Sequence, residues 1–145
     1  MITEIIEAIS VALNSEFGDD YEIHMEEIRQ GLVEPCFFIT CLNPSLKPLA
    51  GNRYQCTNQF CINYFPKSEE KQQECNAVGE RMIWCLEYIT KDGDSKPMRG
   101  TKMNYDVIDG VLNFFVNYDC IVTKTQSQTA MENLDANTTV REERD

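Results

Sequence analysis

Cysteine pairs are the residues of this sequence whose chemistry is the most obvious to consider. Cys56 and Cys61 stand five positions apart within the stretch from Arg53 to Pro66. Two thiols can hold a metal ion or form a redox pair when their sulfurs approach one another. In a strand, however, residues separated by an odd number of positions point to opposite faces. This pair therefore cannot share a metal, and neither can Cys36 and Cys41, which have the same spacing.

The full set of cysteines indicates free thiols rather than a disulfide framework. Seven is an odd number, and no two of them form a C-x-x-C pair. Free cysteine is among the residue types most often buried, so packing is the expected role. A contact between Cys56 and another sulfur on a neighbouring strand is kept as an alternative. The seven are Cys36, Cys41, Cys56, Cys61, Cys75, Cys85 and Cys120.

A nucleophile that depends on histidine would have to use His24, because the sequence holds no other. Glu22 and Glu26 would share its face of a strand, and the three side chains could form a small metal cluster. Alternating polar residues are also typical of a strand face that points to solvent. We expect the solvated face, and keep as an alternative a ligand-binding or catalytic α+β domain that uses His24.

Other catalytic patterns are absent from the sequence. Asp106 and Asp109 could be paired carboxylates, but a turn explains Asp109 and a polar strand face explains Asp106. Every glycine is isolated, so no loop could cradle a phosphate group. We therefore expect a protein that is not an enzyme and has no cofactor and no metal site.

The charge balance argues against binding to nucleic acid. The net charge is -11, from 24 acidic and 13 basic residues, and no two basic residues are adjacent. Phosphate neutralisation needs clustered cations, so no basic nucleic-acid surface is expected. The longest apolar runs, such as residues 36–39, are too short to cross a membrane, and Glu4 and Glu7 interrupt any signal peptide. We expect the protein to stay in a reducing cytoplasm.

The hydrophobic pattern predicts helices and strands in a definite order. Apolar residues at helical spacing predict a first helix over about residues 3–14, and alternation predicts a strand over 21–26. After a turn at 30–35, residues 36–42 are apolar on both faces, as in a covered strand. Two prolines and a Gly-Asn pair predict a loop over 43–52. A strand follows over 53–66, with Tyr54, Cys56, Phe60, Ile62 and Tyr64 on its apolar face.

A second helix is expected to begin at Ser68, which can cap it, with Glu69 and Glu70 in its first turn. The polar segment 91–97 ends it. Gly79 inside this helix costs about 1 kcal/mol relative to alanine, which suggests a close backbone approach there. The apolar stripe of the helix is formed by Cys75, Val78, Met82, Cys85, Leu86 and Ile89.

Asp109 and Gly110 lie between two apolar runs and predict a two-residue hairpin turn. The register imposed by this turn brings apolar residues opposite one another and polar residues opposite polar ones. Turn chemistry and alternation thus agree on one arrangement. The expected pairs are Val107 with Leu112, Tyr105 with Phe114, Met103 with Val116, Asp106 with Asn113 and Lys102 with Asn117.

Together these elements predict an α+β domain over residues 1–123, with a mainly antiparallel sheet of four to five strands packed against two helices. Residues 124–145 are polar and without periodicity, so we expect a flexible C-terminal tail. A chain of 145 residues buries roughly 70% of the surface of its unfolded form, so it needs neither metal nor disulfide to fold.

Surfaces for association are the remaining functional feature of the sequence. Phe115 falls opposite Asn104 on the polar face of the last hairpin, and Phe65 and Ile121 end the polar faces of their strands. Apolar residues on such faces are typical of subunit contacts, although isolated exposed ones are common. The candidate interface residues are Arg53, Phe65, Phe115, Ile121, Pro44, Leu46 and Pro48.

Four motifs in this order resemble the small tail terminator family encoded by phages and prophages of Gram-positive bacteria. They are IRQGLVEPCFFI (residues 28–39), NRYQCTNQFCINYFP (52–66), WCLEYI (84–89) and YDVIDGVLNFFVNY (105–118). The resemblance covers roughly residues 1–122. The matching positions, whose role it implies is mostly structural, are Gln30, Gly31, Glu34, Pro35, Cys36, Phe37, Phe38, Arg53, Tyr54, Tyr64, Phe65, Pro66, Asp109 and Gly110.

The resemblance implies a tail-terminator-like fold and a virion protein of the tail and neck, from a contractile-tailed phage or a phage-derived tail-like particle. Such proteins commonly form a hexameric ring on the head-proximal end of the tail tube, where they stop polymerisation and offer a surface for head joining. The implied partners are other copies of the chain, the tail tube protein, and sheath and neck or connector proteins, met in the bacterial host cytoplasm. A head-tail joining or tail completion protein of the neck is the main alternative.

Overall fold

One sheet organises the molecule, and seven strands belong to it in the described part of the chain, residues 2–25, 32–125 and 140–141 of the computed structural model. The strand order is β1-β2-β3-β7-β6, and β8 lies beside β3 with β9 beyond it. All pairings are antiparallel except that of β1 with β2. The strands are β1 (Glu22–His24), β2 (Cys36–Pro48), β3 (Arg53–Phe65), β6 (Thr101–Ile108), β7 (Val111–Asn117), β8 (Cys120–Lys124) and β9 (Val140–Arg141).

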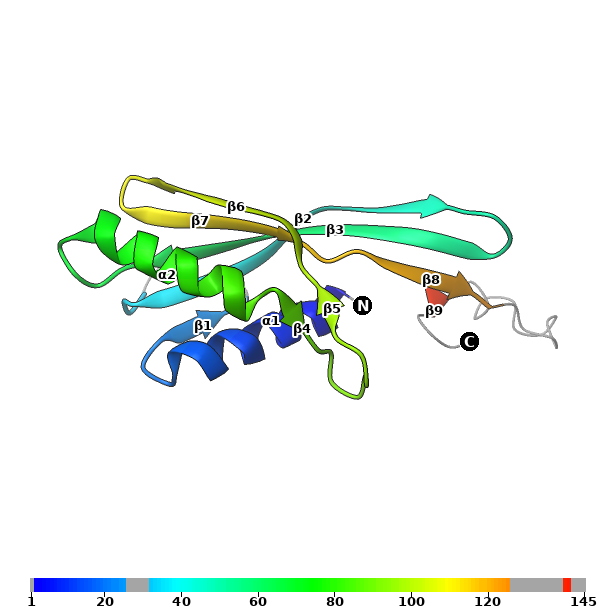
Figure 1. The fold of residues 1–145 in the computed structure, drawn as a ribbon, viewed down its shortest axis with the longest axis horizontal. Helices are drawn as coiled ribbons and strands as arrows, with labels where there is room; N and C mark the ends of the chain where they lie inside the picture. The colour runs from blue at the N-terminus through cyan, green and yellow to red at the C-terminus, as the bar shows by residue number, and fades with distance from the viewer. Residues whose placement is uncertain (1, 26–31, 126–139, 142–145) are drawn as a thin grey trace.

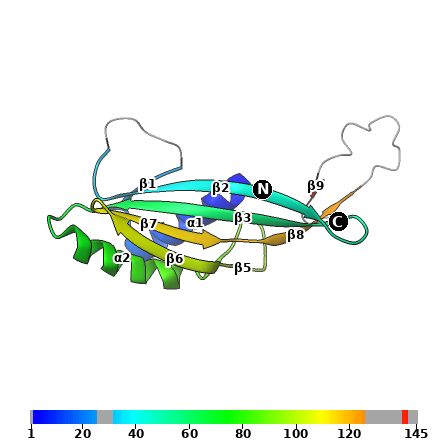
Figure 2. The same cartoon turned by 90° about the horizontal axis from the view of Figure 1, so that it is seen from above.

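Two helices cover one face of this sheet, at one end of the molecule (Figure 1). They are α1 (Ile2–Phe17) and α2 (Lys71–Cys85), and a small second sheet of β4 (Tyr88–Ile89) and β5 (Met98–Arg99) follows α2. The core lies between the helices and the inner faces of β2, β3 and β7. At the other end, β2, β3 and β8 project beyond the helices (Figure 2). The α+β prediction is confirmed.

α1 forms where apolar residues recur at helical spacing, and it extends further than the expected residues 3–14. Gly18 ends it with a φ of +90°, and the Gly18 N–H donates to the carbonyl oxygen of Asn14 at 2.9 Å. Within the described residues, no helix has the length and apolar character needed to cross a bilayer. The buried stripe of α1 consists of Ile5, Ala8, Ile9, Leu13 and Phe17.

β3 is the central strand, because β2 pairs along one of its edges and β7 and then β8 pair along the other. Its side chains alternate between buried and half-buried positions from Cys56 to Phe65, as predicted. Cys56 is 3% exposed on the apolar face, whereas Cys61 is half-buried on the opposite face. Cys56 stands directly opposite Cys120 of β8, so the cross-strand sulfur neighbour kept as an alternative is present.

The expected loop over residues 43–52 is wrong, because β2 continues to Pro48 and leaves only residues 49–52 for the turn. A β-bulge between Leu42 and Ser45 accommodates Asn43, whose φ is +43°, and Pro44. Proline is compatible with this part of β2 because it lies at the edge of the sheet. Among the described residues, β1 pairs with β2 only at positions 36–38.

β6 and β7 form the expected hairpin around Asp109 and Gly110, whose φ angles are both positive. The register is as predicted near the turn and changes at the start of β6. The confirmed pairs are Val107 with Leu112, Tyr105 with Phe114, Asp106 with Asn113 and Asn104 with Phe115.

The two outer pairs of this hairpin, Met103 with Val116 and Lys102 with Asn117, are wrong. Thr101 takes the position opposite Asn117, across a bulge between residues 101 and 104. Lys102 accommodates the extra residue with a φ of +54°. A bulge is a local insertion that regular alternation cannot indicate.

α2 begins at Lys71 rather than Ser68, and it has Glu70 at its N-cap position without a side-chain cap bond. It ends at Cys85, so the expected end at 91–97 is wrong. Leu86 and Ile89 are nevertheless buried, because the chain after the helix continues along the same core. Buried residues that follow a helix can continue its apolar spacing, so the sequence does not distinguish them from a further turn of the helix.

The sheet has more strands than the predicted four to five. β1 adds a parallel strand at one edge, while β8 and β9 extend the sheet beside β3. The predicted flexible tail over 124–145 falls largely outside the described residues; within them, Val140 and Arg141 pair with β8. The single domain over residues 1–123 stays a prediction.

Candidate interaction surfaces

The structure brings few groups together around His24. Its Nε2 lies 3.1 Å from Glu22 Oε1 without hydrogen-bond alignment, and its ring packs edge-on against Phe38 with centroids 5.1 Å apart. The His24 side chain is 17% exposed, which is less than a solvated strand face would give. Glu26 lies outside the described residues. Across the ranges that the structure describes, no three His, Cys, Asp or Glu side chains are grouped as metal ligands.

Five of the thiols lie in surroundings that suppress ionisation. Burial raises the pKa of Cys36 to about 11 and that of Cys85 to about 12. Burial also raises the pKa values of Cys41, Cys61 and Cys75. Because the thiolate is the reactive form, these cysteines are poor nucleophiles at neutral pH.

Most motif residues that the structure describes belong to the packing. Phe37 and Tyr64 meet with ring centroids 4.9 Å apart in the core, and Phe38 and Phe65 meet at 5.7 Å on the outer face of the sheet. Pro35 directly precedes β2, Pro66 directly follows β3, and both are buried; the Glu34-Pro35 bond is cis. Gln30 and Gly31 lie outside the described residues.

Glu74 connects the end of β3 to the start of α2. Its carboxylate accepts hydrogen bonds from the Tyr64 hydroxyl and from the backbone N–H groups of Lys67 and Ser68. Burial by itself would raise the Glu74 pKa, but these bonds favour the charged form and hold the pKa below its ordinary value. Burial and the same carboxylate raise the pKa of Tyr64, which therefore stays a neutral donor.

The most prominent surface is the arm, which we define as residues 43–58 of the β2-β3 hairpin together with residues 120–124 of β8. Four of the candidate interface residues, Pro44, Leu46, Pro48 and Arg53, lie on the hairpin and are exposed. Leu46 shares a face with Cys56, its partner in the β2-β3 register. Ile121 stands opposite Gln55 on the other face and is 48% exposed, as the sequence predicted for a polar strand face.

The two remaining candidates lie away from the arm. Phe65 packs against Phe38, and Phe115 stands opposite Cys61 and Asn104. Both phenylalanines are half-buried on the outer face of the sheet. The structure thus divides the predicted interface into an arm group and a sheet-face group.

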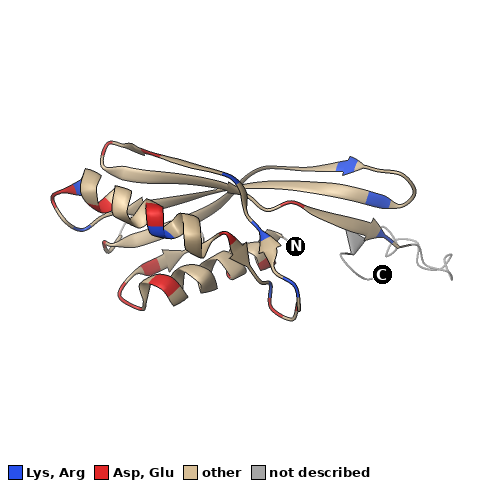
Figure 3. Cartoon of the chain, viewed as in Figure 1, with Lys and Arg blue, Asp and Glu red and all other residues tan. Residues whose placement is uncertain are grey.

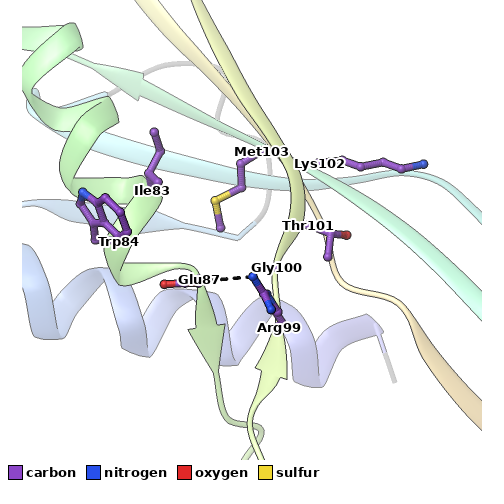
Figure 4. Close-up of a pocket in the computed structure, with 8 residues that line it drawn as sticks. All are labelled: Ile83, Trp84, Glu87, Arg99, Gly100, Thr101, Lys102 and Met103. Carbon is purple, nitrogen blue, oxygen red and sulfur yellow. Dashed lines mark ion pairs between the residues drawn. The ribbon is translucent and has the colours of Figure 1, made fainter.

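A hollow beside the end of α2 is a surface that the sequence analysis missed. It has a volume of about 470 Å³. Figure 4 shows Met103 pointing from β6 toward the last turn of α2, where Ile83 and Trp84 lie. Trp84 is 74% exposed, and the Arg99 guanidinium is 3.9 Å from the Glu87 carboxylate across the hollow. The sequence did contain a signal for an exposed tryptophan, because position 84 lies outside the apolar stripe of the predicted helix.

The sheet also has two edges that stay open within the described residues. β2 lacks a partner on its outer side beyond position 38, and β6 pairs only with β7. Open edges can accept a strand from another chain. The described surface therefore offers an arm, a hollow with an exposed tryptophan, and two strand edges, all of them suited to association.

Comparison with known proteins agrees with a role in association. Residues 4–130 match the family model described as phage tail terminator protein. No curated protein matches the chain. The matched range covers α2, all of α1 except its first two residues, and every strand except β9.

Proposed function

Because the chain belongs to the phage tail terminator family, we propose that it forms a ring on the head-proximal end of the tail tube. The ring ends tube polymerisation and offers the surface to which the head is joined. Members of this family are structural proteins of the phage tail, so the role is assembly rather than catalysis. The observation that carries the proposal is the family match over residues 4–130.

The surfaces of the fold support a ring. A closed ring requires a heterologous contact, in which one patch of a subunit meets a different patch of the next. The open edges of β2 and β6 are two different patches, and the arm extends well beyond the helices (Figure 2). We propose a hexamer that forms on the tube end.

The partners follow from this position. The lower face of the ring contacts the last layer of the tail tube protein, and the upper face contacts neck or connector proteins. In a contractile tail or a tail-like particle, the sheath ends at the same level. Assembly takes place in the cytoplasm of the bacterial host.

Electron microscopy of tails from cells that lack the gene tests the proposal. Overlong tubes are expected, because nothing stops tube growth. Tails of normal length without heads would instead identify a head-tail joining protein and contradict termination.

Complementation distinguishes the proposed terminator role from the alternative of a ligand-binding or catalytic site that uses His24. His24→Ala should restore tail length as well as the wild-type chain does, because His24 has no role in assembly. A variant that folds but fails to restore tail length would favour a site built on His24 and Glu22.

A further inference from the structure

The arm is the basic end of an acidic molecule. It carries Lys47, Arg53 and Lys124, and neither residues 43–58 nor residues 120–124 contain an aspartate or glutamate. The whole chain has a net charge of -11. Figure 3 shows the cations of the arm at one end of the long axis. The arm also exposes apolar surface, since Leu46 and Ile121 are each 48% exposed.

The opposite end of the molecule carries the opposite charge. The α1-β1 turn, the segment before β2, the segment before α2 and the β6-β7 turn all lie there (Figure 1). Val33 is 55% exposed, and Ile108, the last residue of β6, is 56% exposed. Among the described residues, the cations in or next to these segments are Lys67 and Lys71. The acidic end, as we call it, includes Asp19, Asp20, Glu22, Glu69, Glu70 and Asp109.

We propose that the arm of one copy docks on the acidic end of the next copy around the ring. The inference rests on the ring proposed above and specifies its contact. Opposite ends of an elongated subunit are two different patches, as a heterologous contact requires. Opposite charges steer the ends together and fix their register. Ile121, which shares a face of the arm with Lys47, supplies apolar area on one side, and Val33 and Ile108 supply it on the other.

DNA is the other polyanion that a basic arm could meet. The three cations of the arm are few against a net charge of -11, which repels DNA at longer range. Leu46 and Ile121 would have no apolar partner along a phosphate backbone, whereas the acidic end exposes Val33 and Ile108. These observations favour a second copy of the chain.

Charge exchange tests this contact. The arm variant carries Lys47→Glu and Arg53→Glu, and the end variant carries Asp20→Lys and Glu69→Lys. All four side chains are exposed, so the fold is expected to persist, which circular dichroism checks. Each variant alone should fail to restore normal tail length in cells that lack the gene.

Two combinations should restore tail length. In a chain with all four substitutions, the substituted arm positions are acidic and the substituted end positions are basic, so the attraction between these positions returns. Cells that produce the arm variant and the end variant together should also recover, because the two kinds of subunit can alternate around the ring. Matched controls change the same number of residues elsewhere: Lys96→Glu with Ser95→Glu, and Glu80→Lys with Asp92→Lys. The first control uses Ser95 rather than Lys102, because Lys102 lies on the open edge of β6 and Ser95 does not. Both controls should behave as the wild type.

Three outcomes would overturn the inference. The first is normal tail length with either single variant. The second is a folded four-substitution chain that remains as defective as its parents. The third concerns duplex DNA. If the wild-type chain binds it and both the arm variant and the four-substitution chain do not, the arm is a DNA contact.

Sedimentation of the purified chain separates this inference from the proposed function. At about 0.01 M ionic strength, where the Debye length is about 30 Å, the arm and end variants should each self-associate at least about tenfold more weakly than the wild type. Their mixture and the four-substitution chain should recover. If cells lacking the gene make tails of normal length, the proposed role in termination is contradicted. The order of self-association strengths among these samples then tests the contact by itself. Equal sedimentation of all samples would then overturn it.

Discussion

At the residue scale, Glu74 shows how one side chain can determine where a helix begins. Serine is a favoured cap, so the sequence predicted a start at Ser68. In the structure, the Ser68 N–H donates to the carboxylate of Glu74, and α2 begins at Lys71. The acceptor, Glu74, lies within the helix itself, and the Tyr64 hydroxyl of β3 also donates to it. Local sequence rules do not include such a contact between a strand and a helix.

Glu74→Gln should lower the free energy of unfolding by about 1 to 2 kcal/mol at neutral pH, because it removes a charged, partly buried acceptor. The Glu74 pKa is lower in the folded chain than its ordinary value of 4.5, so the stabilising contribution is present above that value. It is lost as the pH falls through the folded-state pKa. Urea unfolding at about pH 7 and pH 3 measures this. A difference between variant and wild type that does not shrink in acid would contradict the assignment.

Gly79 is a residue whose role the sequence did predict. A Cβ at this position would lie 2.8 Å from the ring of Tyr105, so the close approach is confirmed. The close approach could be predicted because glycine is unfavourable inside a helix, although the sequence did not identify Tyr105 as the partner.

Gly79→Ala should destabilise the chain by about 1 kcal/mol, because overpacking against Tyr105 outweighs the gain in helix propensity. In a Tyr105→Ala background the same substitution should stabilise by about 1 kcal/mol, since the clash is gone. Denaturant unfolding of the four proteins measures both effects. The same sign in the two backgrounds would show that the ring is not the obstacle.

At the scale of elements, periodicity predicted the core strands and the hairpin but not the arm. The alternation of β3 and the turn at Asp109 and Gly110 are local signals, and both are confirmed. Pro44 and Pro48 indicated a loop, because proline is rare inside sheets. They are tolerated here at a bulge and at the end of an edge strand, and edge position is a property of the whole sheet.

The end of α2 was misjudged because Leu86 and Ile89 continue its apolar stripe, whereas Trp84 in its last turn lies off that stripe. Trp84→Ser should change the free energy of unfolding by no more than about 0.5 kcal/mol, because the side chain is 74% exposed. Leu86→Ala nearby should cost about 2 to 5 kcal/mol, because Leu86 is fully buried. Thermal unfolding compares the two. Similar losses for both would place Trp84 in the core and contradict a surface role.

At the scale of the whole molecule, the sequence predicted the α+β class and an acidic chain, but not the distribution of charge. The acidic end is assembled from segments around positions 20, 34, 70 and 109, which only the topology brings together. The arm likewise unites residues near 50 with β8, more than sixty positions later. Net charge alone gave no indication that a basic surface exists.

Tube growth in the presence of the purified chain tests the central claim, termination, most directly. Tail tube protein polymerises alone or with increasing amounts of the chain, and electron microscopy measures the tube lengths. We expect the mean length to fall as the chain is added, and capped tubes to stay the same length when fresh tube protein is supplied. Tubes whose length is independent of the chain, or that resume growth at both ends, would contradict the account.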